Sequence, residues 1–236
     1  MPEKPDLAEK GGPRNGQPQA LDRRLFMQLL AFGGAREAGE LAGALEAAGL
    51  EGVLYKDVND AHGVGLLTWS DHPDFFVDHL RPFLAAQPFA GLQLKPEFTM
   101  LGRTYSLGHE PDLEDWLLHK PRRTVLNRES PWAVWYPLRR KGEFSALAPA
   151  DQGPVLAEHG RIGHAFGEAG YAQDVRLACF GLDTHDNDFI IGLIGAELYP
   201  LSACVQQMRK TRQTSQYIER MGPFFVGKAY WQSRLG

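Results

Sequence analysis

Two short stretches, MLGRTY (residues 100–105) and FVGKAY (residues 225–230), decide how this chain is organised. Each has two apolar residues, a glycine, a basic residue and, two positions later, a tyrosine. Self-similarity of this kind is typical of an internally duplicated fold. The sequence therefore predicts two related halves, each ending in one of these stretches as its last strand.

The elements before residues 100–105 predict the order β-α-β-β-α-β. Runs rich in strong helix formers predict helices, and short apolar runs bounded by turn residues predict strands. The expected strands cover residues 21–32, 53–58, 64–69 and 92–106, and the expected helices cover residues 35–50 and 74–85.

The second half repeats this order. Its expected strands cover residues 133–138, 175–182, 189–196 and 224–231, and its expected helices cover residues 148–166 and 200–219. Each half is then a split βαβ, or ferredoxin-like, unit of the α+β class, with its helices on one sheet face. Two such sheets packed face to face predict an α+β barrel of the dimeric type, with outer helices and an internal cavity for a large flat ligand.

The domain boundaries follow from this pattern. We expect a disordered Pro/Gly-rich tail over residues 1–20, a ferredoxin-like half over 21–107, and a second, ligand-binding half over 131–236. The polar segment 108–130 between them predicts a linker with one short helix near residues 112–119.

Composition excludes several classes of protein. A net charge of −4 gives no electrostatic case for nucleic acid. No apolar run approaches the roughly 20 residues that span a bilayer, and residues 1–19 do not read as a signal peptide. Cys179 and Cys204 lack metal-site spacing and suggest reduced thiols in a cytoplasmic protein. The usual phosphate-loop, dinucleotide, zinc-protease and serine-hydrolase motifs are missing from the sequence.

One histidine lies on an apolar helical stripe. Val155, His159, Ile162 and Phe166 follow the spacing i, i+4, i+7 and i+11 of one helix face. Gly160 and Gly163 flank this stripe and are expected to leave flat space beside the imidazole, where a planar macrocycle could lie with its iron bonded to His159. Ile162 and Gly163 are the expected contacts to that macrocycle. A core histidine satisfied by a backbone carbonyl would give the same spacing. His164 falls roughly 140° around the helix, toward solvent.

A tyrosine and a basic run share one predicted strand. Alternation places Tyr136 on the face opposite Trp135. Arg139, Arg140 and Lys141 follow directly and would suit acidic substituents such as propionates. The alternatives are a barrel-lining tyrosine and a solvated strand end.

Arg176 is predicted to face away from Val175 on a later strand. An arginine across a haem from the histidine could hold an anionic or peroxidic oxygen ligand. A surface salt bridge would explain the same arginine.

Four stretches together resemble the chlorite dismutase family, which includes the haem-forming coproheme decarboxylases. They cover the second half well and the first half by architecture only. The matching stretches are KPR at 120–122 with YPLRR at 136–140, HGRIG at 159–163, GLD at 181–183 with DF at 188–189, and MR at 208–209 with Ser215, Tyr217 and GPFFVG at 222–227.

The resemblance implies haem b or coproheme as cofactor, with His159 as the iron ligand. It implies that Tyr136 matches the tyrosine that carries a radical in coproheme decarboxylases, supported by Arg139 or Arg140. It also implies a homo-oligomer, commonly a pentamer. The distal position stays open between Arg176 and Gln173, since counting back from the GLD motif arrives at Asp174.

Three functions are compatible with the resemblance. The first is peroxide-dependent decarboxylation of coproheme in haem biosynthesis, which uses Tyr136. The second is chlorite dismutation to chloride and O2, in which Arg176 would orient the anion. The third is haem binding without turnover. The expected partner is a small molecule, either peroxide or chlorite.

Overall fold

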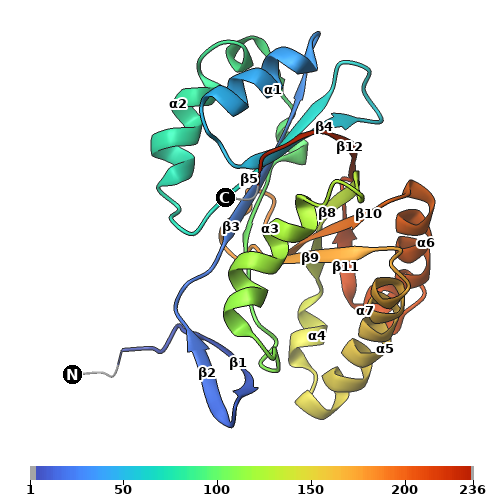
Figure 1. Ribbon diagram of the computed structural model, residues 1–236. Helices are drawn as coiled ribbons and strands as arrows, with labels where there is room; N and C mark the ends of the chain where they lie inside the picture. Colours follow the sequence, from blue (N-terminus) through green and yellow to red (C-terminus); the bar gives the residue numbers. More distant parts are fainter. Residues whose placement is uncertain (1–3, 235–236) are drawn as a thin grey trace.

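The computed structural model describes residues 4–234, and its two halves repeat one order of elements (Figure 1). The first half runs β3-α1-β4-β5-α2-β7 and the second β8-α5-β9-β10-α6-β12, with short additions. The strands are β1 (Glu9–Arg14), β2 (Gln17–Leu21), β3 (Phe26–Gly33), β4 (Gly52–Asp57), β5 (Val64–Ser70), β6 (Gln93–Leu94), β7 (Met100–Arg103), β8 (Trp132–Arg140), β9 (Gln173–Ala178), β10 (Phe189–Gly195), β11 (Ile218–Met221) and β12 (Phe225–Gln232).

The helices of the two repeats follow the predicted order, with a composite second helix and, within the described residues, three further short α-helices. A π-helical turn, Phe76–Leu80, runs directly into α2, and another, Asp115–His119, runs into α3. The α-helices are α1 (Ala38–Ala47), α2 (Arg81–Leu84), α3 (Lys120–Val125), α4 (Gly142–Ala146), α5 (Pro149–Glu168), α6 (Leu198–Met208) and α7 (Arg212–Tyr217). No helix within residues 4–234 has the length and apolar character to cross a membrane.

The strands of both halves join into one closed antiparallel ring. Hydrogen-bonded neighbours lead from β3 through β5, β4, β12, β8, β10, β9 and β7 back to β3. Two junctions, β4 with β12 and β7 with β9, connect the halves. The fold is therefore an α+β barrel built from two ferredoxin-like repeats, as the duplicated sequence predicts.

The barrel interior is filled by large side chains. Trp135, Tyr55 and Phe225 are fully buried there. They fit because glycines face them: a Cβ added to Gly192 would lie 2.5 Å from the Trp135 ring, and one added to Gly65 would lie 2.3 Å from Phe225. The expectation of an internal cavity is therefore wrong, since aromatic rings occupy the space that these glycines leave.

Replacing Gly192 with alanine is expected to lower the free energy of unfolding by about 1–3 kcal/mol, because the methyl group overpacks against Trp135. Urea unfolding measures this change. Gly43→Ala is the matched control: it lies in α1 with no atom within 4 Å of its added Cβ. It should stabilise the chain by about 0.5–1 kcal/mol. Equal effects of the two substitutions would contradict a filled barrel.

The outer face of the second half is covered by a separate apolar layer. Helices α5, α6 and α7 lie to one side of β8–β11 (Figure 1). Outward-facing Tyr136 and Leu138 of β8 pack in this layer with Leu201, Cys204 and Met208 of α6. The expected face of Tyr136 is confirmed, but this face lies outside the barrel, between sheet and helices.

The expected disordered tail is wrong for its central part. Strands β1 and β2 form a hairpin, with Asn15 and Gly16 at positive φ in its turn. Pro/Gly-rich composition suggested disorder, but Asn-Gly is also a strong hairpin signal. The glycines allow close contact with the chain near Glu110, whose carbonyl accepts a hydrogen bond from the Gly12 N–H at 3.0 Å. Residues 1–3 of the expected tail lie outside the described part.

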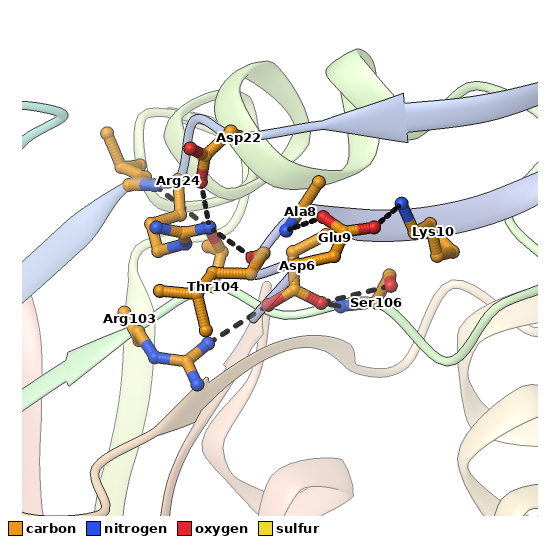
Figure 2. A network of polar contacts seen from close by, with 11 residues as sticks. Asp6, Ala8, Glu9, Lys10, Asp22, Arg24, Arg103, Thr104 and Ser106 are labelled. Atoms are coloured by element: carbon orange, nitrogen blue, oxygen red, sulfur yellow. Dashed lines mark hydrogen bonds and ion pairs between the residues drawn. The ribbon is translucent and has the colours of Figure 1, made fainter. Parts of the chain in front are cut away.

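A carboxylate ties this hairpin to the barrel. Figure 2 shows Glu9 between Arg103 and Ser106. Its oxygens accept hydrogen bonds from the Arg103 guanidinium at 3.1 Å and from the Ser106 N–H at 3.0 Å. Because Arg103 belongs to β7, the hairpin is anchored to a strand of the ring.

The segment 108–130 is more structured than the expected linker. It is helical from Asp115 to Val125, beyond the short helix expected near residues 112–119. Leu117, Leu118 and Val125 join the main core. These three apolar residues hold the segment against the barrel. The mostly polar composition of the segment did not predict this packing.

Candidate functional site

His159 projects from α5 toward the outer face of the sheet. Its neighbours on the predicted stripe, Ile162 and Phe166, pack on the apolar layer. Burial lowers the pKa of His159 to about 4, with further lowering by the positive charges of Arg140 and Arg176. The imidazole is therefore neutral at physiological pH, the form that binds metals.

Within residues 4–234, one nitrogen of the His159 ring has a hydrogen-bond partner. Its Nδ1 lies 3.3 Å from the hydroxyl oxygen of Thr211, the residue before α7. Among the described residues, Nε2 has no hydrogen-bond partner. One neutral imidazole with a free nitrogen suits a metal whose other ligands come from a macrocycle.

Acid is expected to destabilise the folded chain through His159. Below its ordinary pKa of 6.5, the unfolded chain binds a proton that the folded chain resists until about pH 4, so stability falls as pH drops through this window. The loss between pH 7 and 4.5 should be about 2 kcal/mol. Urea titrations of the wild type and His159→Gln at both values measure it. A variant with the same pH dependence as the wild type would contradict the assignment.

Tyr136 and Arg176 share the outer sheet face. In register, Tyr136 of β8 lies opposite Ile191 of β10, which lies opposite Arg176 of β9. The Tyr136 ring stacks on Phe224, with centroids 4.6 Å apart. Burial raises the pKa of the Tyr136 phenol, so the phenol keeps its proton.

The two arginines that follow this tyrosine have different surroundings. Arg139 forms ion pairs with Asp186 at 2.8 Å and Glu219 at 3.5 Å, on the solvent side. Arg140 lies over the rings of Phe144 and Phe189, and its Nε is buried with no partner among the described residues. Burial also lowers the pKa of Arg140. Arg140 is therefore the cation available to an anionic ligand.

Arg176 is held beside two further residues of a shallow cleft. It pairs with Asp174 at 3.0 Å, and its guanidinium carbon lies 5.2 Å from the Trp116 ring centre. The Nζ of Lys120 lies 4.1 Å from the same ring, and burial lowers its pKa. Trp116 is a site residue that the sequence did not single out, since it lies in the segment expected to be a linker.

Of the other residues considered in the sequence, Gly163 lies at the candidate site, whereas Gln173, His164 and Lys141 lie away from it. Gly163 faces the apolar layer, where an added Cβ would lie 3.4 Å from the Met208 methyl. Gln173 is turned away and donates to the Gly167 carbonyl at 3.1 Å. His164 is exposed, as expected, and lies 3.2 Å from the Glu168 carboxylate. Lys141 forms no ion pair within residues 4–234, and it lies before α4, past the strand end.

The assembled site combines an apolar floor with an excess of positive charge. Lys120, Arg140 and Arg176 carry three positive charges, and the carboxylates of Asp174 and Asp188 lie beside Arg176 and Arg140. A third carboxylate, Glu158, pairs with Arg212. A neutral imidazole approaches from the helix side. This donor set fits a planar, mostly apolar group that bears a metal at its centre and carboxylates at its edge.

The chain resembles a known family and known structures. The family model described as chlorite dismutase matches residues 112–230, just over half of the chain. No curated protein sequence matches significantly. A haem-binding protein from Thermus thermophilus is 21% identical, with a TM-score of 0.68 over 88% of this chain and 91% of that one. Chlorite dismutase from Candidatus Nitrospira defluvii, solved with imidazole, is 15% identical, with a TM-score of 0.68 over 88% and 92%.

Proposed function

This chain belongs to the chlorite dismutase family, and we propose that it binds haem or coproheme between α5 and the outer face of β8–β10. His159 would ligate the iron through Nε2. The observation that carries the proposal is this neutral imidazole facing a cationic sheet face, bonded at Nδ1 and, in the part of the chain that the structure describes, without a partner at Nε2. The matching structures named as haem-binding and chlorite dismutase proteins support it.

Arg140 would bind an acidic edge of the cofactor. Its buried Nε lacks a partner in the described chain, and a buried unpaired donor is costly. A propionate would satisfy it through a charge-assisted hydrogen bond. Lys120 and Arg176 could neutralise further carboxylates.

We propose peroxide-dependent decarboxylation of coproheme as the reaction, in the pathway to haem. Bound iron supplies the oxidising power of peroxide. Each propionate, with one peroxide and one proton, gives a vinyl group, CO2 and two waters. Tyr136 would transfer an electron and a proton from its phenol and then take a hydrogen atom from the propionate side chain. Its burial and its stacking on Phe224 hold the phenol in one orientation.

Product analysis tests this reaction. Purified protein is loaded with coproheme and treated with H2O2, and the mass of the extracted pigment is measured by mass spectrometry. The proposal predicts stepwise loss of two carboxyl groups. Unchanged mass with iron still bound would leave haem binding standing and exclude decarboxylation.

Chlorite dismutation is the second candidate, because Arg176 lies on the same sheet face as Tyr136. Its guanidinium would orient the chlorite anion. Oxygen release measured with an oxygen electrode tests this reaction. Haem-loaded protein should evolve O2 from chlorite, and Arg176→Ala should lower the rate of O2 release. No O2, or O2 unaffected by Arg176→Ala, would exclude this role. Haem binding without turnover is what remains if both assays fail.

Arg140→Ala is expected to weaken coproheme binding by about tenfold, the cost of one charge-assisted hydrogen bond of roughly 1.5 kcal/mol. Arg139→Ala is the matched control, since its partners are Asp186 and Glu219 at the surface. It should leave the affinity within about twofold. Fluorescence-quenching titrations give both values. A larger loss for Arg139→Ala would reverse the assignment.

The family also supports a proposal on assembly and location. We expect a homo-oligomer, with a pentamer as the first candidate, in the cytoplasm. Sedimentation equilibrium of the haem-loaded chain gives the subunit number, and a monomer would exclude this proposal.

A further inference from the structure

We propose that Thr211 is a positioning residue that fixes the tautomer of His159. In this arrangement the Nδ1–H of the imidazole donates to the Thr211 hydroxyl, and Nε2 carries a lone pair. The tautomer is a property of the chain alone. Its use in binding iron rests on the proposed function.

Hydrogen accounting at the Thr211 hydroxyl gives the direction of the bond. A hydroxyl has one hydrogen to donate and two lone pairs to accept with. Its short contact, 2.8 Å, is to the Met208 carbonyl oxygen, which can only accept. Longer contacts lead to His159 Nδ1 at 3.3 Å and to the Thr214 hydroxyl at 3.4 Å. With its hydrogen committed to Met208, the hydroxyl can only accept from Nδ1–H.

The surroundings keep this hydroxyl in place. Thr211 is 2% exposed and caps α7, accepting from the Thr214 N–H at 3.4 Å. The adjacent residues also pair: the guanidinium of Arg212, which follows Thr211, lies 3.2 Å from the carboxylate of Glu158, which precedes His159. Two neighbouring contacts therefore hold the start of α7 against α5, so the hydroxyl cannot turn away without disturbing both helices.

The chemistry of the partner sets the charge of the ligand. A hydrogen bond from the second imidazole nitrogen orients a metal-bound histidine and tunes its basicity. A carboxylate acceptor would draw the Nδ1 proton toward itself and give the imidazole partial imidazolate character. The Thr211 hydroxyl is neutral, so His159 would bind iron as a neutral imidazole.

The test begins on the cofactor-free chain. Nitrogen-15 NMR of labelled histidine at pH 7.5 distinguishes a protonated from an unprotonated ring nitrogen. The proposal predicts that wild type and Thr211→Ser show His159 protonated at Nδ1 only. Thr211→Val, of similar volume but without a hydroxyl, should show protonation shared between both nitrogens.

A second measurement follows coproheme affinity and the iron(III)/iron(II) midpoint potential. Thr211→Val should weaken binding by about tenfold, and Thr211→Ser should restore it. Thr211→Asp, if folded by circular dichroism, should lower the midpoint potential, because its carboxylate makes the imidazole a stronger donor. Equal potentials in wild type and Thr211→Asp would contradict the role.

Arg212→Ala separates the hydrogen bond from the docking of α7. It removes the ion pair to Glu158 and keeps the hydroxyl, so the nitrogen shifts of His159 should not change. Shifts like those of Thr211→Val would overturn the proposal, as would a wild-type His159 protonated at Nε2. If the tautomer is confirmed and coproheme does not bind, the proposed function fails and the tautomer assignment stands.

Discussion

His159→Ala is expected to abolish specific coproheme binding, with a loss of affinity of at least about a hundredfold, or roughly 3 kcal/mol. His159 is the one imidazole in the described chain that combines a lowered pKa, a protein partner at Nδ1 and a free Nε2. Without it, the iron would lose the bond to the chain that we propose. Absorbance titration in the Soret region measures the change, and the wild-type band position should not appear.

His164→Ala is the matched control for this result. His164 lies on the same helix but is exposed and pairs with Glu168. Its replacement should leave both the affinity and the band position unchanged. If His164→Ala removed the band and His159→Ala did not, the orientation of α5 in this account would be wrong.

Tyr136→Phe is expected to abolish decarboxylation while coproheme still binds. Phenylalanine keeps the ring that stacks on Phe224 but has no O–H hydrogen to give up. The rate of vinyl formation should fall by at least about a hundredfold, corresponding to roughly 3 kcal/mol in the barrier. Single-turnover reactions with H2O2, analysed by mass, give the rate.

Tyr55→Phe provides the control, because it removes another buried phenol from the barrel interior, on the opposite side of the sheet wall. It should leave the rate within about twofold. If Tyr136→Phe kept the wild-type rate, the decarboxylation would not depend on this phenol. If Tyr136→Phe lost both decarboxylation and coproheme binding, Tyr136 would serve binding rather than chemistry.

Local periodicity was sufficient to predict the repeat and the facing of the site residues. Alternation along β8 and β9 placed Tyr136 and Arg176 on one face, away from Trp135 and Val175, and the structure confirms both. The helical spacing around His159 likewise predicted that Ile162 and Phe166 face the apolar layer with it. These signals succeed because side chains alternate along a strand and repeat every 3.6 residues along a helix.

Contacts between residues far apart in the chain could not be predicted from the sequence. Adjacent Arg139 and Arg140 look equivalent in the sequence. In the fold, Asp186 and Glu219 pair with Arg139, whereas Phe144 and Phe189 lie against Arg140. Thr211 lies 52 residues from His159, so no local pattern could pair them. The sequence could not show that the barrel interior is filled. The filling depends on contacts between aromatic rings and glycines of different strands, which no local pattern reveals.

The most direct test of the central claim is the position of iron in crystals of the coproheme-loaded protein. Anomalous diffraction at the iron edge should give one peak per chain beside Nε2 of His159, between α5 and the outer face of β8–β10. A peak inside the barrel, or one bonded to a residue other than His159, would contradict it.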